Sequence, residues 1–268
     1  MNTRAVIHFA HGNGFPSLAY RKMLNQLKAH DYDVYYIKKI GHNINYPITE
    51  NWPYLVDELI ESIESQINEP IIAVGHSLGG ILSFMAAVKR PELFRAVIGL
   101  DAFWPGKLKL KMLYLAKKFG WTKRTVSATQ AKKRRDHWPS ESELKAYFDA
   151  KPFFQRLDSD CFNDYIKYGI KHDKDGYYLE FDKHREYQIY CTLPHLFSLF
   201  YDSRALHNVP SALIYGKQSE WLKSMGIRAA KKQYQRLCFG IEGSHMFPLE
   251  YPIECADKIH EVIQEHFV

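Results

Sequence analysis

The segment Gly75–Gly79 (GHSLG) has the pattern G-x-S-x-G and lies directly between an apolar run typical of a buried strand and one typical of a buried helix. A tight strand-to-helix turn strains its central residue and projects that side chain above the sheet. Glycines two positions before and after are needed because the backbone passes too close for a side chain. The helix that follows directs N–H groups at any oxyanion formed there. The pattern therefore predicts Ser77 as a nucleophile.

A second glycine-containing turn, HGNG at residues 11–14, follows the first apolar run. Functional loops of parallel sheets lie at the carboxyl ends of strands, so we expect this loop at the same edge as the serine turn. The backbone N–H groups of Asn13 and Leu78 are the predicted oxyanion donors, and His11 and Gly12 are expected to complete the substrate-binding loop. An ordinary glycine turn at the start of a helix is the alternative interpretation.

One of the 13 histidines is set apart by its position. His245, in the segment EGSHMFPLE, follows the last predicted strand in a glycine-flanked loop and comes after Ser77 in the chain. A histidine at that edge of the sheet can take the proton of the serine hydroxyl and later return it. A surface or core role is the usual alternative for a lone histidine. The position favours His245 as the general base.

Strand-like and helix-like runs alternate along much of the chain. Strands are predicted at residues 5–10, 33–38, 71–74, 96–100, 211–215 and 236–239. Helices are predicted after Ser17, from an N-cap at Asn51, over 78–89, around 227–235 and from near Pro252. This alternation indicates an α/β fold in which a mainly parallel sheet is covered by helices on both faces.

The alternation stops between residues 103 and 207, a stretch too long for a loop. We expect residues 1–102 and 208–268 to form one core, and residues 103–207 (the insertion) to be mainly helical, with an amphipathic helix over 108–119. The insertion holds 20 Lys and Arg against 13 Asp and Glu, whereas the whole chain has a formal net charge of +6. Its many aromatic residues are expected mainly to pack the insertion, with a few lining an acyl pocket.

The composition narrows the class of protein. With 46% hydrophobic and 25% charged residues, the chain matches soluble globular domains rather than disordered ones. Its four cysteines are far apart and lack metal-ligand spacing, so we expect no metal site and a reducing, cytoplasmic location. The first residues do not resemble a signal peptide, and the uncharged run 71–88 is better explained by strand, turn and helix than by membrane insertion. No nucleic-acid-binding motif accompanies the basic residues.

The order of HG loop, G-x-S-x-G turn, long insertion and late histidine resembles the α/β-hydrolase superfamily over essentially the whole chain. The segments HGNGFP, NWP, GHSLGG, TLPH and GSHMFP resemble, more narrowly, an uncharacterised bacterial group of such hydrolases. The resemblance implies that the insertion is a helical cap, or lid. Members usually begin with two further strands, the second antiparallel, but here the HG loop begins at residue 11 and leaves no sequence for them. We therefore expect a doubly wound sheet of six parallel strands.

The resemblance also implies a carboxylate that orients the histidine. Its usual position, three residues after the glycine that ends the penultimate strand, holds Ser219 here. Glu220, one residue later, is one candidate. The other is Asp101, at the end of the strand after the serine-bearing helix, where some members such as haloalkane dehalogenases carry their acid. We favour Asp101 and leave Glu220 open.

Dehalogenases and epoxide hydrolases of this family need a carboxylate at the turn between strand and helix. The serine found there in this chain instead favours acyl transfer to water through an acyl-serine. The predicted function is hydrolysis of a small-molecule carboxylic ester or thioester with no metal or organic cofactor. A C–C bond hydrolase or lactonase with the same triad, and a non-catalytic binding protein, are the alternatives. The basic runs 107–111 and 132–135 are either solvated faces or attract an anionic substrate, such as a CoA thioester, or an anionic membrane surface.

Overall fold

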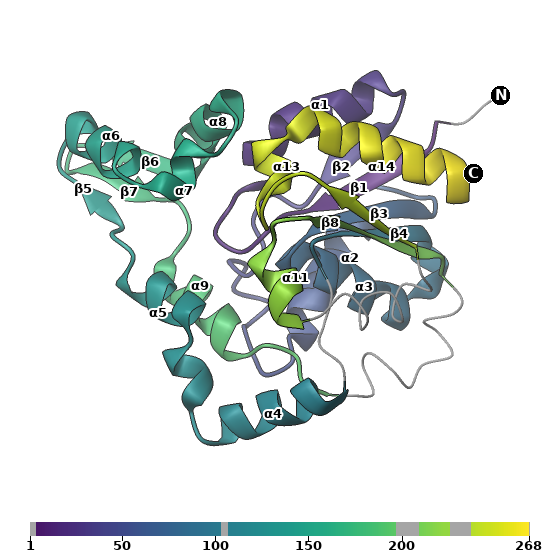
Figure 1. Cartoon of the computed structure of the whole chain (residues 1–268), viewed down its shortest axis with the longest axis horizontal. Helices are drawn as coiled ribbons and strands as arrows, with labels where there is room; N and C mark the ends of the chain where they lie inside the picture. Colours follow the sequence, from purple (N-terminus) through teal and green to yellow (C-terminus); the bar gives the residue numbers. More distant parts are fainter. Residues whose placement is uncertain (1–3, 103–106, 197–208, 226–236, 268) are drawn as a thin grey trace.

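A computed structural model describes residues 4–102, 107–196, 209–225 and 237–267, and its largest element is a six-stranded sheet (Figure 1). The helix predicted around 227–235 and the predicted domain boundaries lie outside these residues. The strand order is β2-β1-β3-β4-β8-β9, and every neighbouring pair is parallel. The strands are β1 (Val6–Ala10), β2 (Asp33–Tyr36), β3 (Ile71–His76), β4 (Phe94–Leu100), β8 (Ser211–Gly216) and β9 (Cys238–Ile241). The predicted doubly wound sheet of six parallel strands is confirmed.

Helices cover both faces of the sheet (Figure 1). One face packs against α1 (Arg21–Ala29), which continues from the 3-10 turn η1 (Ser17–Tyr20), and against α14 (Pro252–His266). The other packs against α2 (Pro53–Glu64) and α3 (Leu78–Lys89). Three short helical segments, η2 (Pro91–Leu93), α11 (Glu220–Met225) and α13 (Phe247–Glu250), lie at the ends of strands or helices.

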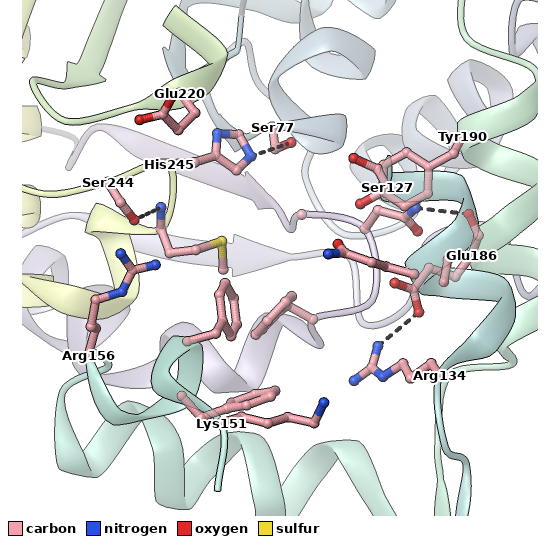
Figure 2. Close-up of a pocket in the computed structure, with 18 of the residues that line it drawn as sticks. Ser77, Ser127, Arg134, Lys151, Arg156, Glu186, Tyr190, Glu220, Ser244 and His245 are labelled. Carbon is pink, nitrogen blue, oxygen red and sulfur yellow. Dashed lines mark hydrogen bonds and ion pairs between the residues drawn. The ribbon is translucent and has the colours of Figure 1, made fainter. Parts of the chain in front are cut away.

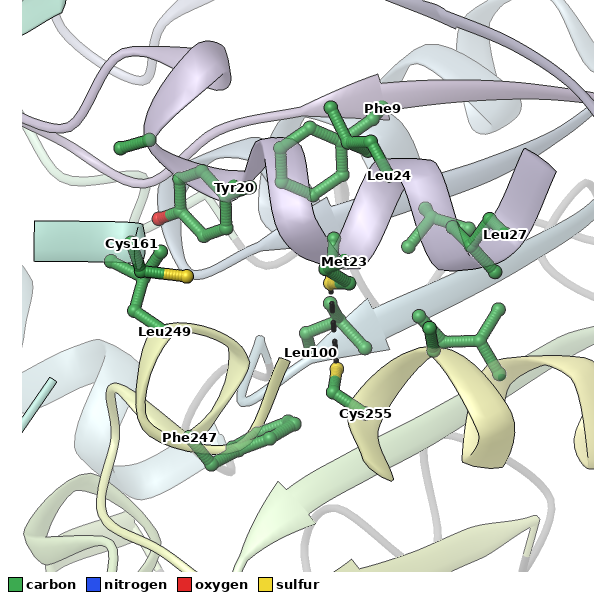
Figure 3. Packing of buried hydrophobic residues seen from close by; sticks show 14 of the residues in the cluster. Phe9, Tyr20, Met23, Leu24, Leu27, Leu100, Cys161, Phe247, Leu249 and Cys255 are labelled. Carbon is green, nitrogen blue, oxygen red and sulfur yellow. Dashed lines mark hydrogen bonds between the residues drawn. The ribbon is translucent and has the colours of Figure 1, made fainter. Parts of the chain in front are cut away.

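The core explains why the central strands carry apolar runs without alternation. Every residue of β1 and β3 is buried, because helices pack on both sides of them. Figure 3 shows the layer beneath α1, where Met23 faces Cys255 of α14 and the two sulfur atoms lie 3.5 Å apart. Phe9 and Phe247 are fully buried in the same cluster.

The chain between β4 and β8 forms a separate group of elements. Its helices are α4 (Lys107–Lys118), η3 (Trp121–Arg124), α5 (Val126–Lys133), α6 (Glu141–Asp149), α7 (Pro152–Gln155), α8 (Ser159–Gly169) and α9 (Lys183–Cys191). It also contains a small antiparallel sheet, β5 (His137–Trp138), β7 (Gly176–Leu179) and β6 (Ile170–Asp173), in the order β5-β7-β6. The sequence analysis did not predict this sheet. Within the described residues, no helix combines the length and apolar character that crossing a membrane requires.

The predicted N-cap at Asn51 is wrong. Helix α2 follows Trp52, which has the left-handed φ of 61° and caps no N–H group with its side chain. The Asn51 side-chain oxygen instead accepts hydrogen bonds from the N–H groups of His195, at 2.8 Å, and Leu196, at 3.3 Å. A residue type that favours N-caps therefore holds the end of the insertion against the core.

Candidate active site

The turn between β3 and α3 has the strained geometry that its sequence predicts. Ser77 lies at φ 51° and ψ −113°, a conformation that L-residues rarely adopt. A Cβ atom on Gly79 would lie 2.1 Å from the carbonyl oxygen of Ala10, and one on Gly75 would lie 2.5 Å from the backbone of Gly79. Side chains at either position would overlap backbone, so glycine is required on both sides of the serine.

Three side chains from three different strand ends form a continuous hydrogen-bonded relay (Figure 2 shows its Ser77–His245 part). His245 Nε2 lies 3.0 Å from Ser77 Oγ, and His245 Nδ1 lies 2.6 Å from Asp101 Oδ2. The carboxylate can only accept, so Nδ1 carries the proton and Nε2 is left to accept from the serine hydroxyl. This is the tautomer in which the histidine can take the serine proton.

The Asp101 carboxylate is fully buried and held by two further donors. Ser219 Oγ donates to Oδ2 at 2.5 Å, and the Gly216 N–H donates to Oδ1 at 3.3 Å. Sequence reasoning noted Ser219 as the occupant of the usual acid position but missed it as a hydrogen-bond donor. Glu220, the other candidate, has a side chain that is 85% exposed and pairs with Lys223 at 2.7 Å. The structure thus brings Asp101, and not Glu220, into contact with His245.

The HG loop lies beside the serine turn, with Gly12 and Asn13 at the cavity wall. The Gly79 N–H donates to the His11 carbonyl at 3.1 Å, which joins the loop to the first turn of α3. Leu78 is the first residue of α3, where N–H groups have no acceptor within the helix. His11 itself is fully buried, with Nδ1–H donating to the Gly12 carbonyl at 2.8 Å and Nε2 accepting from a backbone N–H. Its ring therefore shapes the loop rather than facing the cavity.

Tyr20 and His76 form a buried hydrogen-bonded pair that holds the backbone of His245, and the sequence did not predict this pair. His76 Nε2–H donates to the backbone carbonyl of His245 at 2.8 Å. Its Nδ1 accepts from the hydroxyl of Tyr20 at 2.7 Å, and that hydroxyl accepts from the Gly12 N–H at 3.4 Å. Burial lowers the pKa of His76 to about 3, so the ring is neutral near pH 7. No signal in the sequence marked it, because His76 occupies a variable position of the G-x-S-x-G pattern.

Ser77 and His245 open onto a cavity of about 890 Å³. Figure 2 shows Arg134, Lys151 and Arg156 across the cavity from the serine and the histidine. One wall is largely aromatic and consists of Phe15, Tyr147, Phe148, Phe153 and Phe154. Cations at the wall and rim are Lys133, Arg134, Lys151, Arg156 and Lys223, against the carboxylates of Glu186 and Glu220. Within the described ranges, no group of three or more His, Cys, Asp or Glu side chains is arranged to hold a metal ion.

A buried ion pair joins the insertion to the HG loop. Arg134, just after α5, pairs with Glu186 of α9 at 2.8 Å, and their side chains are only 15% and 10% exposed. Arg134 also donates to the hydroxyl of Tyr165 in α8. The side-chain amide of Asn13 donates to the Glu186 carbonyl at 3.1 Å. Three helices of the insertion and the loop beside Ser77 therefore meet at one point.

Comparisons with known proteins identify the fold. The model of a family described as the alpha/beta hydrolase family matches residues 9–258. A comparison with curated protein sequences finds no match. Among solved structures, the peroxisomal alpha-beta-hydrolase Lpx1 from Saccharomyces cerevisiae is similar, with a TM-score of 0.73 and 19% identity over 98% of this chain and 77% of that one.

Two further solved structures have comparable similarity. One is E-2-(acetamidomethylene)succinate hydrolase, with a TM-score of 0.74 and 18% identity over 98% of this chain and 92% of that one. The other is a thioesterase domain from the curacin biosynthetic pathway, with a TM-score of 0.68 and 17% identity over 96% of this chain and 91% of that one. At these identities the likeness concerns the fold alone.

Proposed function

This chain belongs to the alpha/beta hydrolase family, and on that premise we propose that it is a serine hydrolase that cleaves a carboxylic ester or thioester. The observation that carries the proposal is the relay from Asp101 through His245 to Ser77, with distances of 2.6 Å and 3.0 Å, at the wall of a cavity. A nucleophile bonded to a base that a third group orients is the arrangement that acyl transfer needs.

In the proposed reaction, His245 Nε2 takes the proton of Ser77 as Oγ attacks the substrate carbonyl carbon. The oxyanion that forms accepts hydrogen bonds from the N–H groups of Asn13 and Leu78. His245 then gives the proton to the departing alcohol or thiol, which leaves an acyl-serine. A water molecule, deprotonated by the same Nε2, hydrolyses the acyl-serine and restores the enzyme. Asp101 holds the histidine tautomer and stabilises the imidazolium during both steps.

We also propose that the insertion acts as the cap of this site. Most of the cavity wall opposite Ser77 comes from α5, α6, α7 and α9. The aromatic wall suits an apolar acyl chain, since its closely packed rings present apolar surface to the cavity. The cations that outnumber carboxylates around the cavity favour a substrate with an anionic group. An acyl thioester with a phosphorylated leaving group combines both features.

A fluorophosphonate probe tests the proposal without knowledge of the substrate. We expect the probe to label Ser77 covalently, and we expect Ser77→Ala to abolish labelling. Ser127→Ala is the matched control, because Ser127 also lines the cavity but makes no contact with the relay. If the folded protein is not labelled, that result would favour a non-catalytic binding protein over an enzyme.

A substrate panel then separates the reaction classes. Esters and acyl-CoA thioesters of increasing chain length test the proposed reaction, and lactones and diketones test the alternatives. We expect turnover of the esters or thioesters, with acyl-CoA favoured over neutral esters of the same acyl group. Turnover confined to lactones or diketones would keep the triad but replace the proposed substrate class.

A further inference from the structure

Among the described residues, the contacts of helix α4 with the rest of the molecule include those of the side that carries Leu110, Tyr114 and Lys117. Leu110 is buried, and the side chain of Lys117 is only 7% exposed. Lys117 Nζ donates to the Leu193 carbonyl at 2.6 Å and pairs with Glu50. The ring of Tyr114 packs against that of His195 at a tilt of 35°, with ring centroids 5.4 Å apart. These contacts define the inner side of α4.

The outer side of α4 is an apolar face exposed to solvent. Leu108, Met112, Leu115 and Phe119 recur at intervals of four, three and four residues, so they share one side of the helix. They are 72%, 61%, 47% and 61% exposed. The ring of Trp121, itself 60% exposed, stacks on Phe119 with centroids 5.4 Å apart and extends the same face. Single exposed apolar residues are ordinary, but a contiguous row of five such side chains indicates a binding surface for another molecule or for a membrane.

The chain segment that carries this face has charged residues of one sign. Between Asp101 and Asp136 the sequence contains eleven Lys and Arg residues and no Asp or Glu. Exposed cations lie beside the apolar row, among them Lys111, Lys118 and Lys123. A surface that combines apolar side chains with exposed lysines is complementary to a partner that is both apolar and anionic.

We propose that the outer face of α4 and η3 binds peripherally to an anionic lipid bilayer. An amphipathic helix with apolar residues on one side and lysines at its flanks lies in the plane of the membrane interface, and Trp121 is suited to the headgroup level. Basic residues near such a surface add attraction to anionic lipids. Protein–protein interfaces are, by contrast, depleted of lysine, which argues against a second copy of this chain as the occupant. Figure 1 shows α4 at the outer edge of the molecule, away from β1 and β2.

Vesicle co-sedimentation tests this proposal independently of any catalytic activity. The full chain is mixed with phosphatidylcholine vesicles that contain or lack phosphatidylserine. We expect binding to the vesicles with phosphatidylserine, much weaker binding without it, and a decrease with added salt as the charges are screened. Trp121 fluorescence should shift to shorter wavelength on binding, and Trp121→Phe should remove that shift.

Two pairs of variants separate the apolar and the charged contributions. Leu115→Ser with Phe119→Ser should lower partitioning by roughly ten-fold or more, because both apolar side chains leave the interface. Its control, Ile44→Ser with Tyr54→Ser, removes two exposed apolar residues elsewhere and should bind like the original protein.

The contribution of the lysines is tested with a second variant and control, each of which loses two lysines, so that both have the same net charge. Lys111→Gln with Lys118→Gln should lower partitioning by about 30-fold. Lys145→Gln with Lys174→Gln, which removes exposed lysines outside this face, should have little effect.

Three results would overturn the proposal. The first is no binding of the unmodified protein to phosphatidylserine vesicles at low salt. The second is equal loss of binding in variants and controls. The third is a concentration-dependent dimer that Leu115→Ser with Phe119→Ser disrupts while lipid binding is absent, which would make this face an interface between copies of the chain.

Discussion

Replacing Asp101 by asparagine tests the least predictable member of the relay. Gly216 N–H donates to Oδ1, while Oδ2 accepts from His245 Nδ1 and Ser219 Oγ. In Asp101→Asn the amide oxygen keeps the contact with Gly216 if the NH₂ group takes the place of Oδ2. That NH₂ then donates to His245 Nδ1, which moves the histidine proton to Nε2. A protonated Nε2 cannot accept the proton of Ser77.

The size of the effect follows from these contacts. The opposite amide orientation would set its NH₂ against the Gly216 N–H, and an unmet buried donor costs about 1–3 kcal/mol. The productive tautomer is therefore about 5- to 150-fold less populated. Loss of a buried carboxylate 2.6 Å from the developing imidazolium accounts for a further reduction. We expect a total loss of about 10⁴-fold in kcat, as for the corresponding substitution in serine proteases.

The assay compares two variants on the same activated ester, with the rate of fluorophosphonate labelling as a second readout. Glu220→Gln is the matched control, because Glu220 is exposed and pairs with Lys223 rather than with His245. A surface ion pair contributes little, so we expect less than about a two-fold change. A larger loss in Glu220→Gln than in Asp101→Asn would refute the reasoning, and equally small losses would mean that another group orients His245. Thermal unfolding of both variants checks that the fold is intact.

Two further predictions concern the buried histidines. His76→Leu should lower kcat by up to about 10²-fold with little change in KM, because the His245 backbone loses its donor, and His76→Gln should recover part of the loss. Burial lowers the pKa of His8 and His76 to about 3 and of His11 and His42 to about 4, so below pH 6.5 the unfolded chain takes up protons that the folded chain does not. Burial raises the pKa of Glu58 to about 7, so between pH 4.5 and 7 the folded chain holds one proton that the unfolded chain does not, which cancels the effect of one histidine. The free energy of unfolding in urea should therefore fall by about 4 kcal/mol from pH 6 to pH 5, and a flat profile would contradict this.

The centre of the sheet was predictable because β1 and β3 are buried on both faces and therefore contain continuous apolar residues. The small sheet of the insertion was not, because β6 (IKHD) is mostly exposed and has no apolar pattern. Strand pairing there depends on the tight turn before Gly176, whose φ of 127° only glycine adopts readily. Asn51 shows the same limit, since its capping preference is outweighed by backbone groups that lie 144 residues away in sequence.

The candidate site likewise combines features that are encoded locally with features that depend on packing. The pattern around Ser77 is local, because a strand, a strained turn and a helix are all encoded within a few residues. The hydrogen bond between Tyr20 and His76, 56 residues apart, depends on how η1 packs against β3, and no local pattern encodes it. The ion pair between Arg134 and Glu186 of the insertion likewise depends on packing between helices rather than on either residue's sequence neighbours.

The sequence favoured Asp101 as the carboxylate near His245 but left Glu220 open, because both follow strands whose ends lie at the same edge of the sheet. Asp101 follows β4 and Ser219 follows β8, and these strands are parallel neighbours whose carboxyl ends meet at one edge. The Ser219 hydroxyl lies 2.5 Å from the same oxygen that His245 Nδ1 contacts at 2.6 Å. A carboxylate on either strand can therefore reach the histidine without moving it. The chemistry requires a carboxylate near Nδ1, not a given place in the chain, and where Asp101 supplies it the usual position can hold a serine that stabilises the buried charge.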